Sequence, residues 1–187
     1  ENGDYSKAVL YYTQALVYAG ENDVVNLYTL RRYASYGKGD YDSVIEDFTK
    51  AISLNSEDAI DYKRRGYVHG NERDYNRAIE DYNQAIRLKS EDAIAYRRRG
   101  CIYGNKRDYN SAIEDYNQAI SLNPKDAIAY RGRGYIYWNK RDYDSAIEDY
   151  NQAIRLNPKD AIAYAFRGSA YFLKNDYDRG IEEFNKA

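Results

Sequence analysis

Residues Asp74 to Ile86 read DYNRAIEDYNQAI, and nearly the same stretch returns at Asp108 to Ile120 and at Asp142 to Ile154. Each copy begins 34 residues after the one before it. Such a period is typical of chains built from small helical units that stack on one another. Weaker copies begin at Asp4, Asp40 and Asp176. The sequence therefore predicts a single domain, 1–187, that is one array of repeats.

Two helices are expected in each repeat, because two sets of small and apolar residues recur at helical spacing. Tyr96, Gly100 and Tyr103 share one helix face, and a second set begins at Ala112. A short turn between the two helices gives an antiparallel helical hairpin and an all-α fold. The predicted complete repeats are 25–58, 59–92, 93–126 and 127–160, with partial repeats at 1–24 and 161–187.

Aspartates and prolines mark the expected helix ends. Asp92 and Asp126 stand just before first helices, and Asp108 stands before a second helix. A carboxylate in this position can accept hydrogen bonds from the first backbone N–H groups of the helix. Pro124 and Pro158 follow second helices, which proline cannot continue.

The repeats resemble those of the tetratricopeptide repeat family, whose 34-residue unit carries an aromatic residue, a Gly, a Tyr, two Ala positions, an aromatic residue and a late Pro. The matches in the repeat from Ala93 are Tyr96, Gly100, Tyr103, Ala112, Tyr116, Ala119 and Pro124. The departures are Arg32 in place of Gly, Ser35 and His69 in place of Tyr, and Ser56 and Ser90 in place of Pro. The resemblance implies a right-handed α-solenoid of antiparallel helix-turn-helix units, with the first helices on the concave surface.

An arginine recurs on the buried face of each first helix, where an apolar residue would be the simpler choice. These arginines are Arg31, Arg65, Arg99, Arg133 and Arg167, and the acids on the second helices are Asp47, Asp81, Asp115, Asp149 and Glu183. A buried charge without a partner is unfavourable, so we expect each arginine to pair with the acid of its own hairpin. The 24 tyrosines mostly keep phase with the repeat, and we expect them to serve packing.

The concave positions vary between otherwise copied repeats, whereas convex positions such as Asn117 and Gln118 repeat and are expected to be merely solvated. The candidate peptide-binding residues are Lys63, Arg64, Tyr67, Asn71, Arg97, Arg98, Asn105, Arg131, Tyr135, Trp138, Asn139, Phe166 and Phe172. Their basic members suit carboxylates, and their aromatic members suit a bulky apolar side chain. We therefore predict a protein partner that is bound through an acidic peptide segment.

Three other interpretations remain open. Lysine and arginine could simply keep the concave face soluble, although this does not account for Trp138 and Phe172 in exposed phase. The arginines and aromatic residues could bind single-stranded nucleic acid, but the net charge of -2 and the pI of about 5.6 argue against that partner. Open array ends could join copies of the chain into a homo-oligomer through apolar faces that bear Val9, Leu16, Ile181 and Phe184.

No enzyme activity and no cofactor are expected. The one histidine, His69, stands where the next three repeats have Tyr, so we interpret it as a packing residue. The one cysteine, Cys101, has no histidine partner in phase and cannot form an internal disulfide. The sequence has no Gly-rich phosphate loop, no metal-spaced Cys and His cluster and no apolar run of membrane-spanning length. We expect the natural N-terminus to lie upstream of this chain, so the sequence does not fix the cell compartment. The cytoplasm is slightly favoured.

Overall fold

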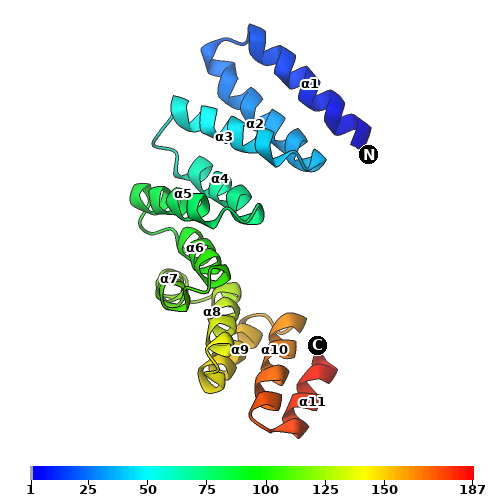
Figure 1. The fold of residues 1–187 in the computed structure, drawn as a ribbon, viewed down its shortest axis with the longest axis vertical. Coiled ribbons are helices and arrows are strands. Elements are labelled where there is room, and N and C mark those ends of the chain that lie inside the picture. Colours follow the sequence, from blue (N-terminus) through cyan, green and yellow to red (C-terminus); the bar gives the residue numbers. More distant parts are fainter. Residues whose placement is uncertain (1) are drawn as a thin grey trace. The chain divides into compact units, whose positions relative to one another are not determined.

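In a computed structural model, which describes residues 2–187, α-helices follow one another through short connections, and no strand occurs among the described residues (Figure 1). The helices of this part are α1 (Asn2–Tyr18), α2 (Glu21–Lys38), α3 (Tyr41–Leu54), α4 (Ala59–Asn71), α5 (Tyr75–Leu88), α6 (Ala93–Asn105), α7 (Tyr109–Leu122), α8 (Ala127–Asn139), α9 (Tyr143–Leu156), α10 (Ala161–Leu173) and α11 (Tyr177–Lys186). The side chains of residues 2, 3, 21, 22 and 25 are not described, and Glu1, in the predicted partial repeat 1–24, lies outside the described residues. The prediction of an all-α fold is confirmed.

The chain forms two compact units, Glu1–Ser90 with α1 to α5 and Glu91–Ala187 with α6 to α11. Within each unit, every helix contacts the next helix along the chain, as in a stack of hairpins. The hairpins of the second unit are α6 with α7, α8 with α9 and α10 with α11. The division of the chain into one array with the repeat boundaries given above remains a prediction.

The predicted N-caps are present at the helix starts. The Asp92 carboxylate accepts hydrogen bonds from the backbone N–H groups of Ile94 and Ala95 in the first turn of α6. Asp108 accepts a hydrogen bond from the backbone N–H of Ser111 in the first turn of α7. These contacts satisfy N–H groups that have no partner within their own helix.

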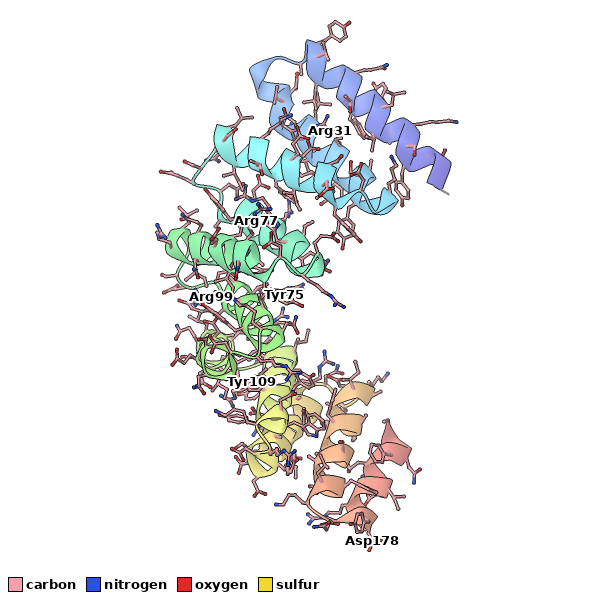
Figure 2. All side chains as sticks on the ribbon, in the orientation of Figure 1. Arg31, Tyr75, Arg77, Arg99, Tyr109 and Asp178 are labelled. Atoms are coloured by element: carbon pink, nitrogen blue, oxygen red, sulfur yellow. The ribbon has the colours of Figure 1, made fainter. Side chains whose placement is uncertain are left out.

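A largely buried arginine on each first helix joins that helix to the second helix of the same hairpin. Arg133 on α8 donates from Nε and Nη2 to the Asp149 carboxylate on α9, at 2.8 and 2.7 Å. Arg99 on α6 makes the same bidentate contact with Asp115 on α7, at 2.8 and 2.6 Å. The equivalent pairs are Arg31 with Asp47, Arg65 with Asp81 and Arg167 with Glu183, and Figure 2 labels Arg31 and Arg99. The predicted pairing across each hairpin is confirmed.

The same arginines also contact the preceding hairpin, which the sequence analysis did not predict. Arg133 donates from Nη1 to the side-chain oxygen of Asn117 on α7 at 2.6 Å, and Arg167 donates in the same way to Asn151 on α9 at 2.6 Å. The corresponding contacts in the first unit are Arg65 with Thr49 at 2.9 Å and Arg31 with Thr13 at 3.2 Å. Asn117 is exposed as expected, but it is not merely solvated, because it links two hairpins.

The acids of these pairs are held in an environment that disfavours their charge. Burial raises the pKa of Asp115 and of Asp149, because desolvation of each carboxylate outweighs its hydrogen bonds with Arg99 or Arg133. The hydrogen bond with Asp149 in turn raises the pKa of Arg133. The ionised carboxylate is therefore tolerated inside the hairpin only while the guanidinium faces it.

Tyrosine rings fill much of the remaining space, in agreement with the predicted packing role. Tyr82 and Tyr150 are almost fully buried. Gly134 permits the close packing of α8 on α9, because a Cβ atom there would lie 3.0 Å from the Tyr150 ring. A second row of rings lies 5.4 to 5.8 Å from the guanidinium carbons of the paired arginines and consists of Tyr62, Tyr96, Tyr130 and Tyr164.

We predict that Arg133→Ala lowers the free energy of unfolding by about 3 kcal/mol, because it leaves the Asp149 carboxylate buried without its partner. The loss should shrink in acid, since a protonated Asp149 no longer carries a buried charge. Urea denaturation followed by circular dichroism at neutral and acid pH measures both effects.

Asn117→Ala should lower the free energy of unfolding by about 1 kcal/mol, because it removes the acceptor of the hydrogen bond from Arg133. The matched control is Gln118→Ala on the same exposed face, which should change stability by less than about 0.5 kcal/mol. Equal effects of the two substitutions would show that the link between hairpins contributes nothing.

Candidate functional site

The first helices of the second unit lie closer to one another than its second helices do. Helix α6 contacts α8, and α8 contacts α10. Within Glu91–Ala187, no such contact joins α7 to α9 or α9 to α11. The side chains that project from α6, α8 and α10 away from the second helices therefore share one face, which we call the inner face.

Three of the predicted aromatic residues meet on this inner face. Tyr135 and Trp138 come from α8, where their rings stack with centres 6.3 Å apart. Phe166 from α10 packs edge-on against both rings, at 5.3 Å from Tyr135 and 6.1 Å from Trp138. Tyr135 remains 42% exposed, so this aromatic cluster of Tyr135, Trp138 and Phe166 reaches the surface.

Phe172, the fourth predicted aromatic residue, is not part of the aromatic cluster. It lies near the end of α10, where its ring packs edge-on against Tyr177 at the start of α11 with centres 4.8 Å apart. Its side chain is 46% exposed. The structure thus divides the predicted apolar pocket into the aromatic cluster and a separate pair of rings at the α10–α11 turn.

Two hydrogen-bond donors, one in the aromatic cluster and one beside it, are buried without a partner among the described residues. The Trp138 Nε1 atom and the Tyr150 hydroxyl have no hydrogen-bond partner among the described residues. The Tyr150 ring stacks under Phe166 at 6.0 Å, and burial raises the pKa of its hydroxyl. An unsatisfied buried donor is unfavourable by about 1 to 3 kcal/mol. A hydrogen-bond acceptor that reached either donor would therefore be bound favourably.

Two of the predicted basic residues are already paired within the protein. Arg97 on α6 places Nε 2.8 Å from the carboxylate of Asp126, the N-cap of α8. Arg131 on α8 donates from Nη1 to both carboxylate oxygens of Asp160, the N-cap of α10, at 2.8 Å. These contacts tie one first helix to the start of the next. Sequence reasoning missed them, although the spacing of 29 residues from arginine to acid is the same in both.

The other candidate residues stand apart from the aromatic cluster or at its edge. Arg98 and Asn105 are exposed on α6, and the Asn139 side chain donates to the backbone carbonyl of Tyr135 at 2.8 Å. The candidates of the first unit all lie on α4 and comprise Lys63, Arg64, Tyr67 and Asn71, of which the last three are exposed. The second unit therefore holds both the aromatic cluster and the arginines nearest to it in sequence.

His69 is buried on α4 and Cys101 is exposed on α6, and the pKa of each is shifted in the direction that favours the neutral form. Burial lowers the pKa of His69, and this effect outweighs the attraction of Asp81 and Asp74 for an imidazolium, which Arg65 and Arg77 oppose. The pKa of the Cys101 thiol is raised by desolvation, although Arg98 and Arg97 act in the opposite direction. Within residues 2–187 no group of three or more His, Cys, Asp or Glu side chains could hold a metal ion. A membrane-spanning helix is likewise missing from the described part of the chain.

Comparisons with known proteins identify the repeat. A family profile described as Tetratricopeptide repeat matches residues 97–161 and 136–187, and one described as TPR repeat matches residues 74–107. A search among curated proteins found no match. These profiles agree with the resemblance that the repeated residues carry.

Several solved structures have the same fold. A crystal structure of MamA is 28% identical, covers 81% of this chain and 89% of its own, and superposes with a TM-score of 0.75. A tetratricopeptide repeat protein from Parabacteroides merdae is 22% identical, with coverages of 98% and 72% and a TM-score of 0.85. YrrB, described as a TPR protein with an unusual peptide-binding site, is 20% identical, with coverages of 94% and 89% and a TM-score of 0.70. The last two likenesses show the fold alone, and the predicted fold class is confirmed.

We predict that acidification destabilises the protein through His69. The pKa of its imidazole in the folded state lies below the value of about 6.5 expected in the unfolded chain. Protonation therefore favours the unfolded state, and the stability due to His69 is lost as the pH falls from that value through the folded-state pKa. Thermal unfolding between pH 7.5 and 5 measures the loss. His69→Tyr, which cannot titrate in this range, should lose less stability than the natural chain, and identical pH profiles would contradict the assignment.

Proposed function

The chain belongs to the tetratricopeptide repeat family, whose members are generally protein-interaction scaffolds, and we propose that it is a non-catalytic scaffold that binds an acidic peptide segment of another protein. The proposed binding residues are the thirteen candidates named from the sequence. Nine of them lie on α6, α8 and α10 of the second unit, whose inner face is the proposed binding face, and the other four lie on α4 of the first unit.

The aromatic cluster is the observation that carries this proposal. One repeat earlier, the positions of Tyr135 and Trp138 hold Cys101 and Gly104, and Gly132 stands one repeat before Phe166. Compared with the preceding repeat, large rings thus stand in place of small residues at these three positions. Aromatic side chains in a partly exposed cluster are common anchors of binding energy. The cluster therefore supports a pocket for a bulky apolar side chain of the partner.

Charge on the inner face supports an acidic partner. Arg97 and Arg131 already face Asp126 and Asp160, yet a guanidinium has five N–H donors and can hold two carboxylates at once. Arg98 is exposed, where a charge mainly speeds encounter and makes binding sensitive to salt. The buried Trp138 Nε1 atom adds a donor that a peptide carbonyl could satisfy after a small movement of the ring.

We predict that Trp138→Ala weakens peptide binding by at least about 2 kcal/mol, or about 30-fold in Kd, because it removes the largest ring of the aromatic cluster. Peptides are first selected from a random displayed library with the natural chain, and the Kd of the best peptide is then measured by fluorescence anisotropy. We expect the selected peptides to carry Asp or Glu and at least one large apolar residue.

The matched control is Gln118→Ala on the second-helix side, which should leave the Kd unchanged. Raising the salt concentration should weaken binding mainly through slower association. Selected peptides without acidic residues, or peptides that bind the Trp138→Ala variant as well as the natural chain, would contradict the proposal.

Self-association is a second candidate, because the outer helices of both units expose apolar faces. On α1 the predicted residues Val9 and Leu16 are only partly exposed, whereas Leu10 and Val17, two turns apart on one face, are 60% and 74% exposed. On α11, Tyr177, Ile181 and Phe184 share one face and are 46 to 55% exposed. Burial of one such face against the other in a second copy would give a head-to-tail contact.

Sedimentation velocity across a range of protein concentrations tests this contact. We expect the natural chain to form dimers and longer species as the concentration rises, whereas Ile181→Glu, which puts a charge on the α11 face, should remain a monomer. Gln152→Glu on the exposed side of α9 is a control for added charge alone. A natural chain that stays monomeric at all concentrations would exclude self-association through these faces.

A further inference from the structure

A pocket of about 360 Å³ lies in the first unit between α3, α4 and α5. It is lined by Ile45, Thr49, Arg65, His69, Arg77, Glu80 and Asp81. Arg65 and His69 project from α4 one helical turn apart, on a different side of that helix from Lys63 and Tyr67. The pocket is thus separate from the proposed peptide-binding face.

His69 explains why a pocket opens at this place. The equivalent residues of the next three repeats are Tyr103, Tyr137 and Tyr171, and an imidazole is smaller than a phenol ring. The hairpin of α10 and α11 shows how the space is otherwise filled, since the Arg179 guanidinium lies 4.5 Å from the centre of the Tyr171 ring. In α6, the Arg99 guanidinium lies 5.9 Å from the Tyr103 ring. A tyrosine ring beside arginine is therefore the usual occupant of this position in the chain itself.

The pocket keeps the arginines but lacks the ring. Arg77 on α5, labelled in Figure 2, stands at the same repeat position as Arg179, three repeats later, whereas the two repeats between them have Ser111 and Ser145 there. It pairs with Asp74 at 3.3 Å, is largely exposed and covers no Tyr, Phe or Trp ring among the described residues. Arg65 is held at the base of the pocket by Asp81 and Thr49. Both arginines line the pocket together with His69.

The lining suits a neutral ring that carries a hydroxyl. Positive and negative charges balance, because Arg65 and Arg77 are accompanied by Glu80 and Asp81. Ile45 supplies an apolar wall, while the Glu80 and Asp81 carboxylates can accept a hydrogen bond from a phenol. A charged side chain would find no net opposite charge here, and an aliphatic one would lose the contact with the arginines.

We propose that this pocket binds a tyrosine side chain of a partner protein, whose ring takes the place that Tyr103, Tyr137 and Tyr171 occupy in the other repeats. The chain would then hold partners at two places, with the inner face for an acidic segment and the α3–α5 pocket for a tyrosine. The second contact does not depend on the first, because it uses other residues on another side of α4.

The test titrates N-acetyl-L-tyrosinamide into the natural chain and follows the imidazole proton signal of His69 by NMR. His69 is the only histidine, so the signal needs no further assignment. We expect a saturable shift. N-acetyl-L-leucinamide, which has no ring, should bind at least about fivefold more weakly, and Arg77→Ala should weaken binding of the tyrosine probe about fivefold through loss of the cation–π contact.

Two substitutions at the same repeat position serve as matched controls. His69→Tyr should fill the pocket, keep the fold and abolish the saturation-transfer signal of the probe ring. Tyr171→His should open the equivalent space between α9, α10 and α11, where Arg179 stands at the position of Arg77, and raise the number of bound probes from one to two. No saturable shift up to the solubility of the probe, or a probe signal that His69→Tyr or Arg77→Ala leaves unchanged, would overturn the proposal.

Discussion

The rest of the fold depends on a guanidinium that is shared between hairpins. Arg133 uses Nε and Nη2 to hold the Asp149 carboxylate of its own hairpin and Nη1 to hold Asn117 of the hairpin before it. Because burial disfavours the carboxylate charge, the acid can lie at the helix interface only with the arginine in place. The arginine thereby fixes which side of the first helix faces the second helix. The opposite side, which is the inner face, is left for residues that need not maintain the fold.

The sequence predicts interactions within a hairpin better than those between hairpins. The N-caps and the Arg99–Asp115 pair depend on helical phase and on positions within one repeat, both of which can be read from the spacing of residues. The contact of Arg97 with Asp126 depends on how successive first helices stack. Without that geometry, an arginine on the exposed phase of a helix is indistinguishable from one that binds a ligand. The role of Asn117 is overlooked for the same reason, because an exposed side chain can still accept a hydrogen bond from a long side chain such as that of Arg133.

The candidate site shows a similar limit along the helix axis. Tyr135 and Trp138 on α8 and Phe166 on α10 lie on the same side of their helices and close together along the helix axes, and their rings form one aromatic cluster. Phe172 is also an aromatic residue of α10, but it lies six residues after Phe166, or about 9 Å further along the axis. It therefore meets Tyr177 at the turn instead. The pocket beside His69 could not be predicted at all, because a missing ring becomes a cavity only when neighbouring helices fail to close over it.

The contact between Arg133 and Asn117 also determines how the second unit responds to thermal fluctuation. In a stack of hairpins, the strength of coupling between neighbours, relative to the stability of one hairpin alone, sets how many hairpins open together. A guanidinium that is bound to two hairpins strengthens that coupling. When α8 separates from α9, Arg133 also loses its fixed position for the hydrogen bond to Asn117 on α7. The same holds for Arg167, which joins α10 and α11 to α9. Opening events in this unit consequently extend beyond a single hairpin, and the inner face is presented as a cooperative block rather than as independent helices.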